Sequence, residues 1–287
     1  MNNRENCVEY EKPKQKVSTL RKIYILRLIF RCLILAACIL IAIFFPQEMQ
    51  VLEGWNFFKK LTPLHLLWVL WVLDMLWQLI PVKNKIALGS QKLFQFRFIP
   101  AEDLKRINYK NLRDYIIQTT KQAYKVMLLW AAAIIFLTLL RYFNIITDTY
   151  LFLFTVTFYV CDLICVLIWC PFRLIMKNRC CTTCRIFNWD HLMMFTPMLF
   201  IRGFYPLSLL LMSILVWLIW ELAVMMYPER FSEITNEALR CSNCTDKLCT
   251  QYCQKLRTPN NPDVQPIERL EEKIEEKIGE KIDNLKK

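Results

Sequence analysis

The sequence predicts an all-α polytopic membrane protein with a cysteine-rich cytoplasmic loop and tail. Its 287 residues are 55% apolar, and the mean hydropathy is +0.27. The apolar residues gather into runs that predict about five or six membrane segments, since a helix needs roughly 20 residues to cross a bilayer. The formal net charge is +12, and the basic residues flank these runs. That placement is typical of contact with membrane lipid and argues against nucleic acid as a partner.

The chain begins with a polar segment, residues 1–22, and a first span follows at about 23–45. Pro46 and the residues after it do not form a small-x-small cleavage site, so we interpret this span as a retained anchor and not a signal peptide. Arg27 and Arg31 lie one helical turn apart near its start. We expect both side chains to snorkel to the lipid headgroups.

The second span, about 63–81, contains an aspartate, Asp74, and a histidine near its start, His65. The connection before it, 46–62, carries aromatic residues that suit a membrane interface. A carboxylate inside a membrane segment points to function by default. The alternative is that Asp74 accepts a hydrogen bond from a neighbouring helix or stays protonated.

A long basic connection, 82–125, precedes the third span at about 126–146. Within it, the apolar spacing and Pro100 predict an amphipathic helix over 101–125, lying on the membrane surface or against other loops. The fourth span is about 149–176, and Pro171 should kink or end it. This span carries four side chains of interest, which are Cys161, Asp162, Cys165 and Cys170. The three thiols are either small buried hydrophobes or redox thiols.

Two alternatives remain open for the last span. Residues 190–204 are too short to cross alone, whereas 207–227 form a full span that contains Glu221. In the favoured arrangement, 190–204 is a half-helix that enters the membrane and 207–227 returns, so the tail is cytoplasmic. In the other, 190–204 lies at the interface or re-enters, and the tail is outside. Lys and Arg are concentrated in the N-terminus, 82–125 and 173–190, so the N-terminus and the loop after the fourth span should be cytoplasmic.

The tail divides by composition into a cysteine-rich segment at 228–256, a Pro- and Asn-rich linker at 257–266 and a charged helix at 267–287. The helix carries an apolar stripe and could mediate self-association with a second copy. The alternative is a solvated helix that docks weakly.

Seven of the 13 cysteines lie in the loop and the tail. Two C-x2-C pairs can supply the four thiolates of a structural zinc site. These proposed metal ligands are Cys181, Cys184, Cys241 and Cys244, with Cys180, Cys249, Cys253 and His191 as possible additions. The same cysteines could instead hold an iron–sulfur cluster, exchange thiols and disulfides, or remain uncoordinated.

A resemblance rests on the stretch 179–190 (RCCTTCRIFNWD), the WCPF run at 169–172 and the later CSNC at 241–244. Over about 160–250 the chain resembles an uncharacterised bacterial family of small polytopic membrane proteins with a cysteine-rich loop. The resemblance implies an integral protein of a bacterial plasma membrane and assigns no reaction or ligand.

The sequence contains no motif of a known catalytic class, so no catalytic residue is assigned. The favoured hypothesis is a non-enzymatic membrane protein in which zinc clamps the loop to the tail, because metal binding can supply folding energy to segments without a core. The first alternative is a membrane redox protein that uses a cluster or exchanging thiols. The second is a transporter or channel that uses the intramembrane carboxylates Asp74, Asp162 and Glu221.

Overall fold

The computed structural model describes residues 19–80, 98–100, 109–176, 186, 189–232 and 235–237. The regular secondary structure in these ranges is helical, which confirms the predicted all-α class. Four helices are long and apolar enough to cross a membrane, and they suggest a membrane-embedded protein. They cover the ranges Arg21–Phe44, Leu112–Tyr142, Asp148–Leu167 and Phe204–Met226. The count of five or six membrane segments stays a prediction.

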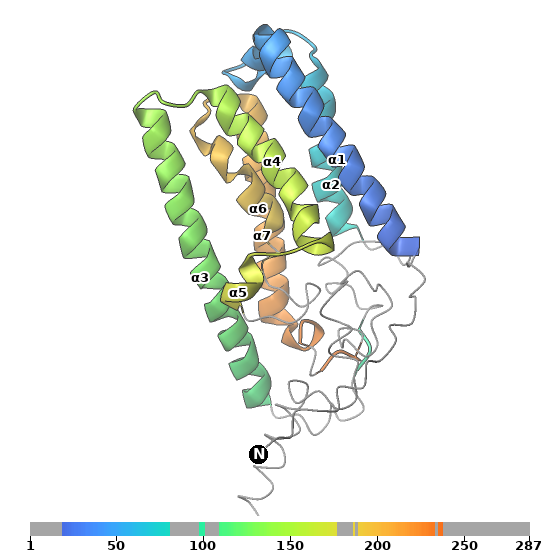
Figure 1. Ribbon diagram of the computed structural model, residues 1–287. Helices are drawn as coiled ribbons and strands as arrows, with labels where there is room; N and C mark the ends of the chain where they lie inside the picture. The colour runs from blue at the N-terminus through green and yellow to red at the C-terminus, as the bar shows by residue number, and fades with distance from the viewer. Residues whose placement is uncertain are drawn as a thin grey trace, which may run out of the picture.

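The first helical pair is α1 (Thr19–Phe44) and the shorter apolar helix α2 (Pro63–Leu79). Between them lie two 3-10 helices, η1 (Pro46–Leu52) and η2 (Asn56–Phe58), at the upper end of the bundle in Figure 1. We call this the η1–η2 end. Pro63 occupies the first turn of α2, where its missing N–H costs no intrahelical hydrogen bond.

The second pair is α3 (Tyr109–Tyr142) and α4 (Asp148–Leu167), followed by the short helix α5 (Phe172–Met176). Residues 109–125, expected in a surface helix separate from the third span, are continuous with that span in α3. Neither glycine nor proline interrupts 109–142, so nothing local ends the helix there. By contrast, α4 stops at Leu167, before Pro171, and α5 is a separate turn at the opposite end, which we call the α5 end (Figure 1).

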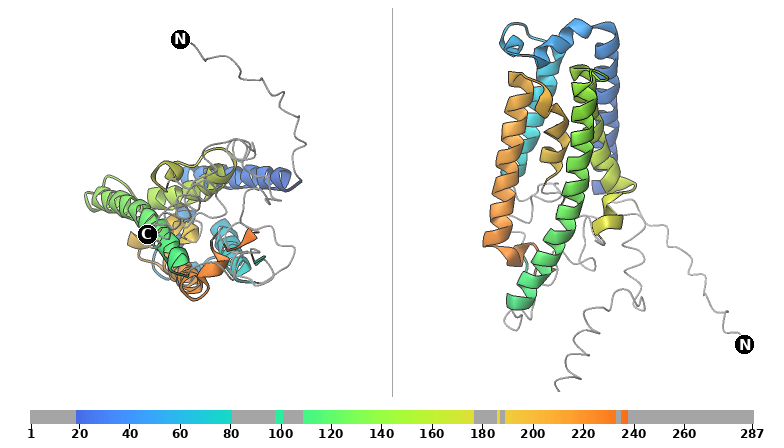
Figure 2. Two further views of the ribbon diagram at one scale, coloured as in Figure 1. Left: turned by 90° about the horizontal axis from the view of Figure 1, so that it is seen from below. Right: turned by 90° about the vertical axis from the view of Figure 1, so that its left-hand side faces the viewer.

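The last elements form a hairpin whose first arm lies inside the bundle. The helix α6 (Asp190–Phe195) continues into the 3-10 helix η8 (Thr196–Phe200), and α7 (Phe204–Met226) runs back beside them to η9 (Pro228–Arg230) (Figure 2, right). Contacts to α3, α4 and α7 surround η8, while α7 also packs against α2. Trp71 of α2, Phe195 of α6 and Tyr205 of α7 are completely buried in this core.

At the η1–η2 end, a close backbone approach joins the connection between α1 and α2 to the turn between η8 and α7. The amide of Gly54 donates to the Arg202 carbonyl at 2.7 Å, and the amide of Phe204 donates to the Gly54 carbonyl at 2.9 Å. A Cβ atom on Gly203 would lie 2.0 Å from the carbonyl oxygen of Leu52. Only glycine therefore fits at position 203 without moving the backbone. We call this contact the Gly54–Gly203 clamp.

Aromatic packing surrounds the clamp. Phe57 contacts Phe204 with ring centroids 5.0 Å apart and also packs against His65 at 4.4 Å. His65 in turn accepts the amide hydrogen of Thr62 on Nδ1 at 3.0 Å and lies 2.8 Å from the Phe57 carbonyl through Nε2. The histidine predicted near the start of the second span therefore caps α2 and ties it to η2.

Candidate functional site

Arg31 of α1 points into the bundle and binds carboxylates from two other helices. Its Nη1 donates to Asp162 Oδ2 of α4 at 2.9 Å and to the Tyr159 carbonyl at 2.6 Å. Its Nη2 lies 3.8 Å from Asp74 Oδ2 of α2, and its guanidinium carbon stacks 3.8 Å from the centroid of the Tyr159 ring. The expectation that Arg31 snorkels to the headgroups is wrong, because partners inside the bundle satisfy its charge.

His191 of α6 continues this set of contacts on the other side of Asp74. Its Nε2 lies 3.4 Å from Asp74 Oδ2, and its Nδ1 lies 2.8 Å from Asp190 Oδ1. The amide nitrogen of Gln78 lies 3.1 Å from the same Nδ1. Both ring nitrogens face carboxylate oxygens, as the two donors of an imidazolium would, whereas the Gln78 amide nitrogen fits an acceptor at Nδ1.

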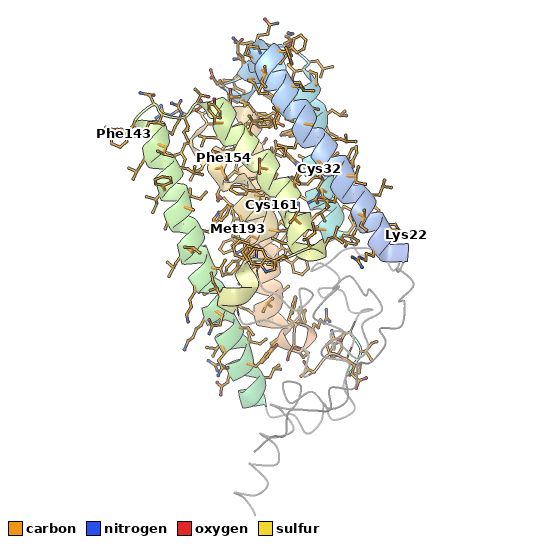
Figure 3. The ribbon with its side chains drawn as sticks, in the orientation of Figure 1. Lys22, Cys32, Phe143, Phe154, Cys161 and Met193 are labelled. Carbon is orange, nitrogen blue, oxygen red and sulfur yellow. The ribbon has the colours of Figure 1, made fainter. Side chains whose placement is uncertain are left out.

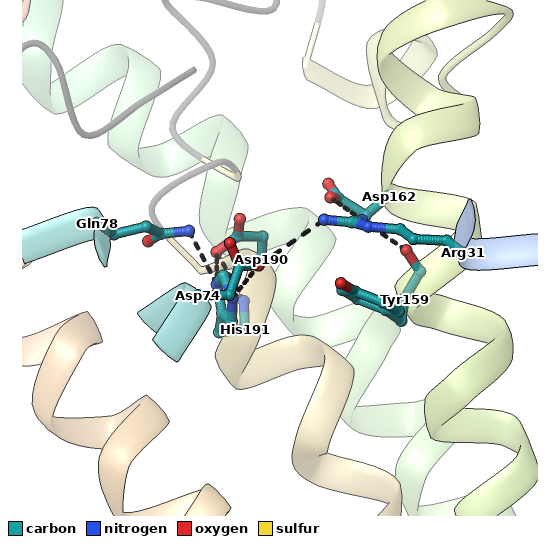
Figure 4. A network of polar contacts seen from close by, with 7 residues as sticks. All are labelled: Arg31, Asp74, Gln78, Tyr159, Asp162, Asp190 and His191. Carbon is teal, nitrogen blue, oxygen red and sulfur yellow. Dashed lines mark hydrogen bonds and ion pairs between the residues drawn. The ribbon is translucent and has the colours of Figure 1, made fainter. Parts of the chain in front are cut away.

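The result is a row of alternating charges from four helices, Asp162–Arg31–Asp74–His191–Asp190, which we call the charged chain (Figure 4). Removing ions from water costs several kcal/mol each, and close pairing of opposite charges offsets part of that cost. The charged chain therefore carries a desolvation cost in an apolar bundle. Ionisable side chains inside a membrane most often mark a functional site, so we take the charged chain as part of the candidate site.

A cavity of about 320 Å³ adjoins the charged chain. Its wall is formed by α3, α4, α6 and the segment around α5, and it is mostly apolar. The lining residues are Trp130, Phe158, Cys161, Asp162, Cys165, Cys170, Pro171, Phe172, Ile186, Asp190, Met193 and Met194. The two carboxylates that end the charged chain, Asp162 and Asp190, thus both reach this cavity.

The three predicted redox thiols line the same cavity. Cys161 and Cys165 lie one turn apart on α4 and are partly exposed, whereas Cys170 is buried in the connection to α5. Cys165 and Cys170 thus lie in the wall of one cavity, and none of the three cysteines is joined in a disulfide. In Figure 3, Cys161 lies on α4 between the heights of Phe143 and Lys22.

The predicted intramembrane carboxylates divide into two environments. Asp74 and Asp162 belong to the charged chain through Arg31, whereas Glu221 of α7 accepts a hydrogen bond from the indole of Trp189 at 2.6 Å. The sequence patterns did not indicate the roles of Arg31 and Asp190. The available signal for Arg31 was the presence of an arginine in one apolar span and of aspartates in other spans.

The predicted metal ligands in the loop and tail lie outside the described residues. They are Cys180, Cys181, Cys184, Cys241, Cys244, Cys249 and Cys253. His191, a possible additional ligand, has carboxylate partners at both nitrogens. In the described ranges, no group of three or more histidine, cysteine, aspartate or glutamate side chains is arranged to hold a metal ion. The zinc and iron–sulfur hypotheses therefore stay predictions.

Comparison with known proteins leaves the site to be interpreted from its own geometry. No family model, curated protein or solved structure matches the chain. The resemblance to a bacterial membrane family over about 160–250 accordingly stays a prediction.

Proposed function

We propose that this is an integral membrane redox protein in which Cys165 and Cys170 form and break a disulfide inside the bundle. The observation that carries the proposal is a pair of free cysteines, Cys165 and Cys170, in the wall of one cavity that also holds two carboxylates. A buried structural cysteine needs none of these neighbours, since it packs as a small hydrophobe.

The chemistry is a two-electron exchange. In the oxidising direction the two S–H bonds break, one S–S bond forms, and two protons and two electrons pass to an apolar acceptor in the cavity. The reducing direction reverses each change. The attacking sulfur must lose its proton first, because the thiolate is the nucleophile. Asp162 and Asp190 are the carboxylates within the cavity wall that can receive protons.

The charged chain supports this role by holding both carboxylates in place. Asp162 is held by Arg31 and Asp190 contacts His191, so each carboxylate has a basic neighbour. A proton that arrives at either carboxylate changes the charge balance of the whole charged chain. Asp74 links its two halves, because it lies between Arg31 and His191. The charged chain thus connects the two carboxylates of the cavity wall electrostatically.

Differential alkylation tests the proposal. The full chain in lipid nanodiscs is treated with diamide, its remaining thiols are blocked with one maleimide, and thiols released by reduction are labelled with a heavier one. We expect mass spectrometry to find a Cys165–Cys170 disulfide, and Cys165→Ser should leave Cys170 reduced. Cys32→Ser is the matched control, because Cys32 is exposed on α1 and does not line the cavity. A wild-type protein whose Cys165 and Cys170 remain reduced under diamide would overturn the proposal.

A zinc clamp is a second candidate function, and one observation favours it. The elements that flank the two cysteine clusters, α5 and η9, both contact α3 and lie at the same end of the bundle (Figure 1). Chain segments that leave from one end can bring thiolates to one ion. We expect elemental analysis of anaerobically purified protein to find zinc that is lost in the double variant Cys181→Ser/Cys241→Ser. Visible absorbance that bleaches on reduction would instead favour an iron–sulfur cluster.

A further inference from the structure

We propose that the acceptor is a lipid-soluble quinone whose ring occupies the cavity, so that the protein exchanges electrons between the Cys165–Cys170 pair and the membrane quinone pool. This inference rests on the proposed thiol function and adds the substrate class to it. It follows from the volume, lining, charge and position of the cavity.

The size and lining suit a ring with two carbonyl groups. The volume of about 320 Å³ is near the lower limit of small-molecule pockets, roughly 300–1,000 Å³, and would hold a ring headgroup but not a dinucleotide. Five of the twelve lining residues are aromatic or methionine side chains, including Trp130, Phe158 and Met193. Such side chains pack well against a planar, polarizable ring.

The aromatic wall is held in position. The indole nitrogen of Trp130 donates to Thr196 Oγ1 of η8 at 2.9 Å, and its ring packs edge-on against Phe158 with centroids 4.7 Å apart. These contacts join α3, α4 and η8 at the cavity, so the wall is built before a ligand arrives. A preformed wall of this kind lowers the cost of ordering side chains on binding.

Charge argues against the soluble redox cofactors. Among the described residues that line the cavity, the charged side chains are two carboxylates, Asp162 and Asp190. Nicotinamide and flavin dinucleotides carry phosphates, which like charges repel and which need basic or backbone N–H partners. A neutral quinone has no such conflict, and once reduced its hydroxyls can donate hydrogen bonds to the carboxylates.

Position favours a ligand that arrives through lipid. Trp130 lies in the candidate span Leu112–Tyr142, and Cys161 and Cys165 lie in the candidate span Asp148–Leu167. Both thiol side chains are partly exposed. A neutral, lipid-soluble oxidant can therefore reach the cavity between two membrane helices, whereas a charged one would have to cross apolar surface.

The reaction balances without a further reagent. The S–H bonds of Cys165 and Cys170 break and one S–S bond forms. The two electrons reduce the quinone ring, and the two protons convert its carbonyl oxygens to hydroxyls, which gives one quinol per disulfide. Asp162 and Asp190 carry the protons between sulfur and ring oxygen. They are the titratable side chains besides the cysteines in the described lining.

The test uses reduced full-length protein in nanodiscs without oxygen. Decylubiquinone or menadione is added, and loss of quinone absorbance is followed by stopped-flow. We expect one quinone to be reduced per protein, with a Cys165–Cys170 disulfide as the product. Cys165→Ser should abolish the reaction, and Cys32→Ser should leave it unchanged.

Two variants separate ring binding from proton transfer. Trp130→Phe should raise the quinone concentration for half-maximal rate about threefold to tenfold, through loss of the indole and its anchor. Asp190→Asn should slow the maximal rate by roughly 10²-fold. Oxidation of each variant by diamide, measured in parallel, shows whether the thiol pair is still intact.

The outcomes distinguish the two proposals. If diamide forms the disulfide but neither quinone is reduced, the quinone inference is overturned and the thiol function stands. Quinone reduction that persists in Cys165→Ser would likewise overturn the quinone inference, because the electrons would then come from another group. If diamide does not form the disulfide either, both proposals fail.

Discussion

The η1–η2 end and the charged chain hold the same bundle together by different means. At the η1–η2 end, backbone hydrogen bonds of the Gly54–Gly203 clamp and aromatic packing join the hairpins. Its ion pair, Lys60 with Glu48, lies at the surface, and the lysine side chain is 66% exposed. In the charged chain, the Arg31 side chain is only 13% exposed and pairs with Asp162 and Asp74.

The difference separates interactions that hold a fold from those that also serve chemistry. The clamp uses groups that every chain has, and it costs little because backbone donors and acceptors satisfy each other. The charged chain carries a desolvation cost that apolar side chains of equal volume would avoid. A bundle that needed only stability would use more contacts like the clamp, so we attribute the charged chain to the cavity that Asp162 and Asp190 line.

The largest effect is expected from removing the cation at the centre of the charged chain. Arg31→Met should lower the free energy of unfolding by about 3–5 kcal/mol, because Asp162 and Asp74 lose their shared partner inside the bundle. Chemical unfolding in detergent micelles measures the change. The double variant Arg31→Met/Asp162→Asn should be less unstable than the sum of the single changes. A loss no larger than that of a surface ion pair would contradict the comparison.

At the opposite region, the clamp should be most sensitive to one added methyl group. Gly203→Ala should cost about 1–3 kcal/mol, since its Cβ must displace the Leu52 carbonyl. Gly54→Ala is the matched control: its Cβ meets nothing within 4 Å, and the cost of its positive φ is about 1 kcal/mol. The same unfolding assay ranks the two, and equal losses would argue against the close approach.

The histidine cap of α2 should have a smaller effect. His65→Phe keeps the ring contact with Phe57 but removes both ring nitrogens, so it should cost about 1 kcal/mol. Asparagine at this position can still reach the Thr62 amide and should recover part of the loss. Thermal unfolding followed by tryptophan fluorescence is suitable, because Trp55 and Trp68 pack beside Phe57 and its neighbours.

The smallest effect is expected for the surface ion pair. Lys60→Ala should change the stability by less than about 1 kcal/mol, and salt should weaken the effect further. Unfolding at low and high ionic strength measures this. Together with Arg31→Met, this variant compares the loss of a cation at the surface with the loss of a cation inside the bundle. A large loss of stability in Lys60→Ala that salt does not weaken would remove the distinction between the two regions.

Local patterns predict the class of fold well and the interior poorly. The apolar runs indicate the helical membrane class, and the position of Pro171 anticipates a break after α4. They do not reveal that α3 extends back to Tyr109. An amphipathic segment and an apolar span that follow each other can form one continuous helix, and their different spacing does not mark a boundary. They place Arg31 at the headgroups, although its partners come from helices that are distant in sequence.

By itself, the sequence determined which segments are apolar helices and which side chains in them carry charge or sulfur. Both are local properties of composition and period. The tertiary structure alone decided that Asp162 and Asp190 end one row of charges, and that Cys165 and Cys170 share their cavity. Those contacts depend on how each helix is rotated and crossed against its neighbours, and packing across the bundle sets that rotation after the helices have formed.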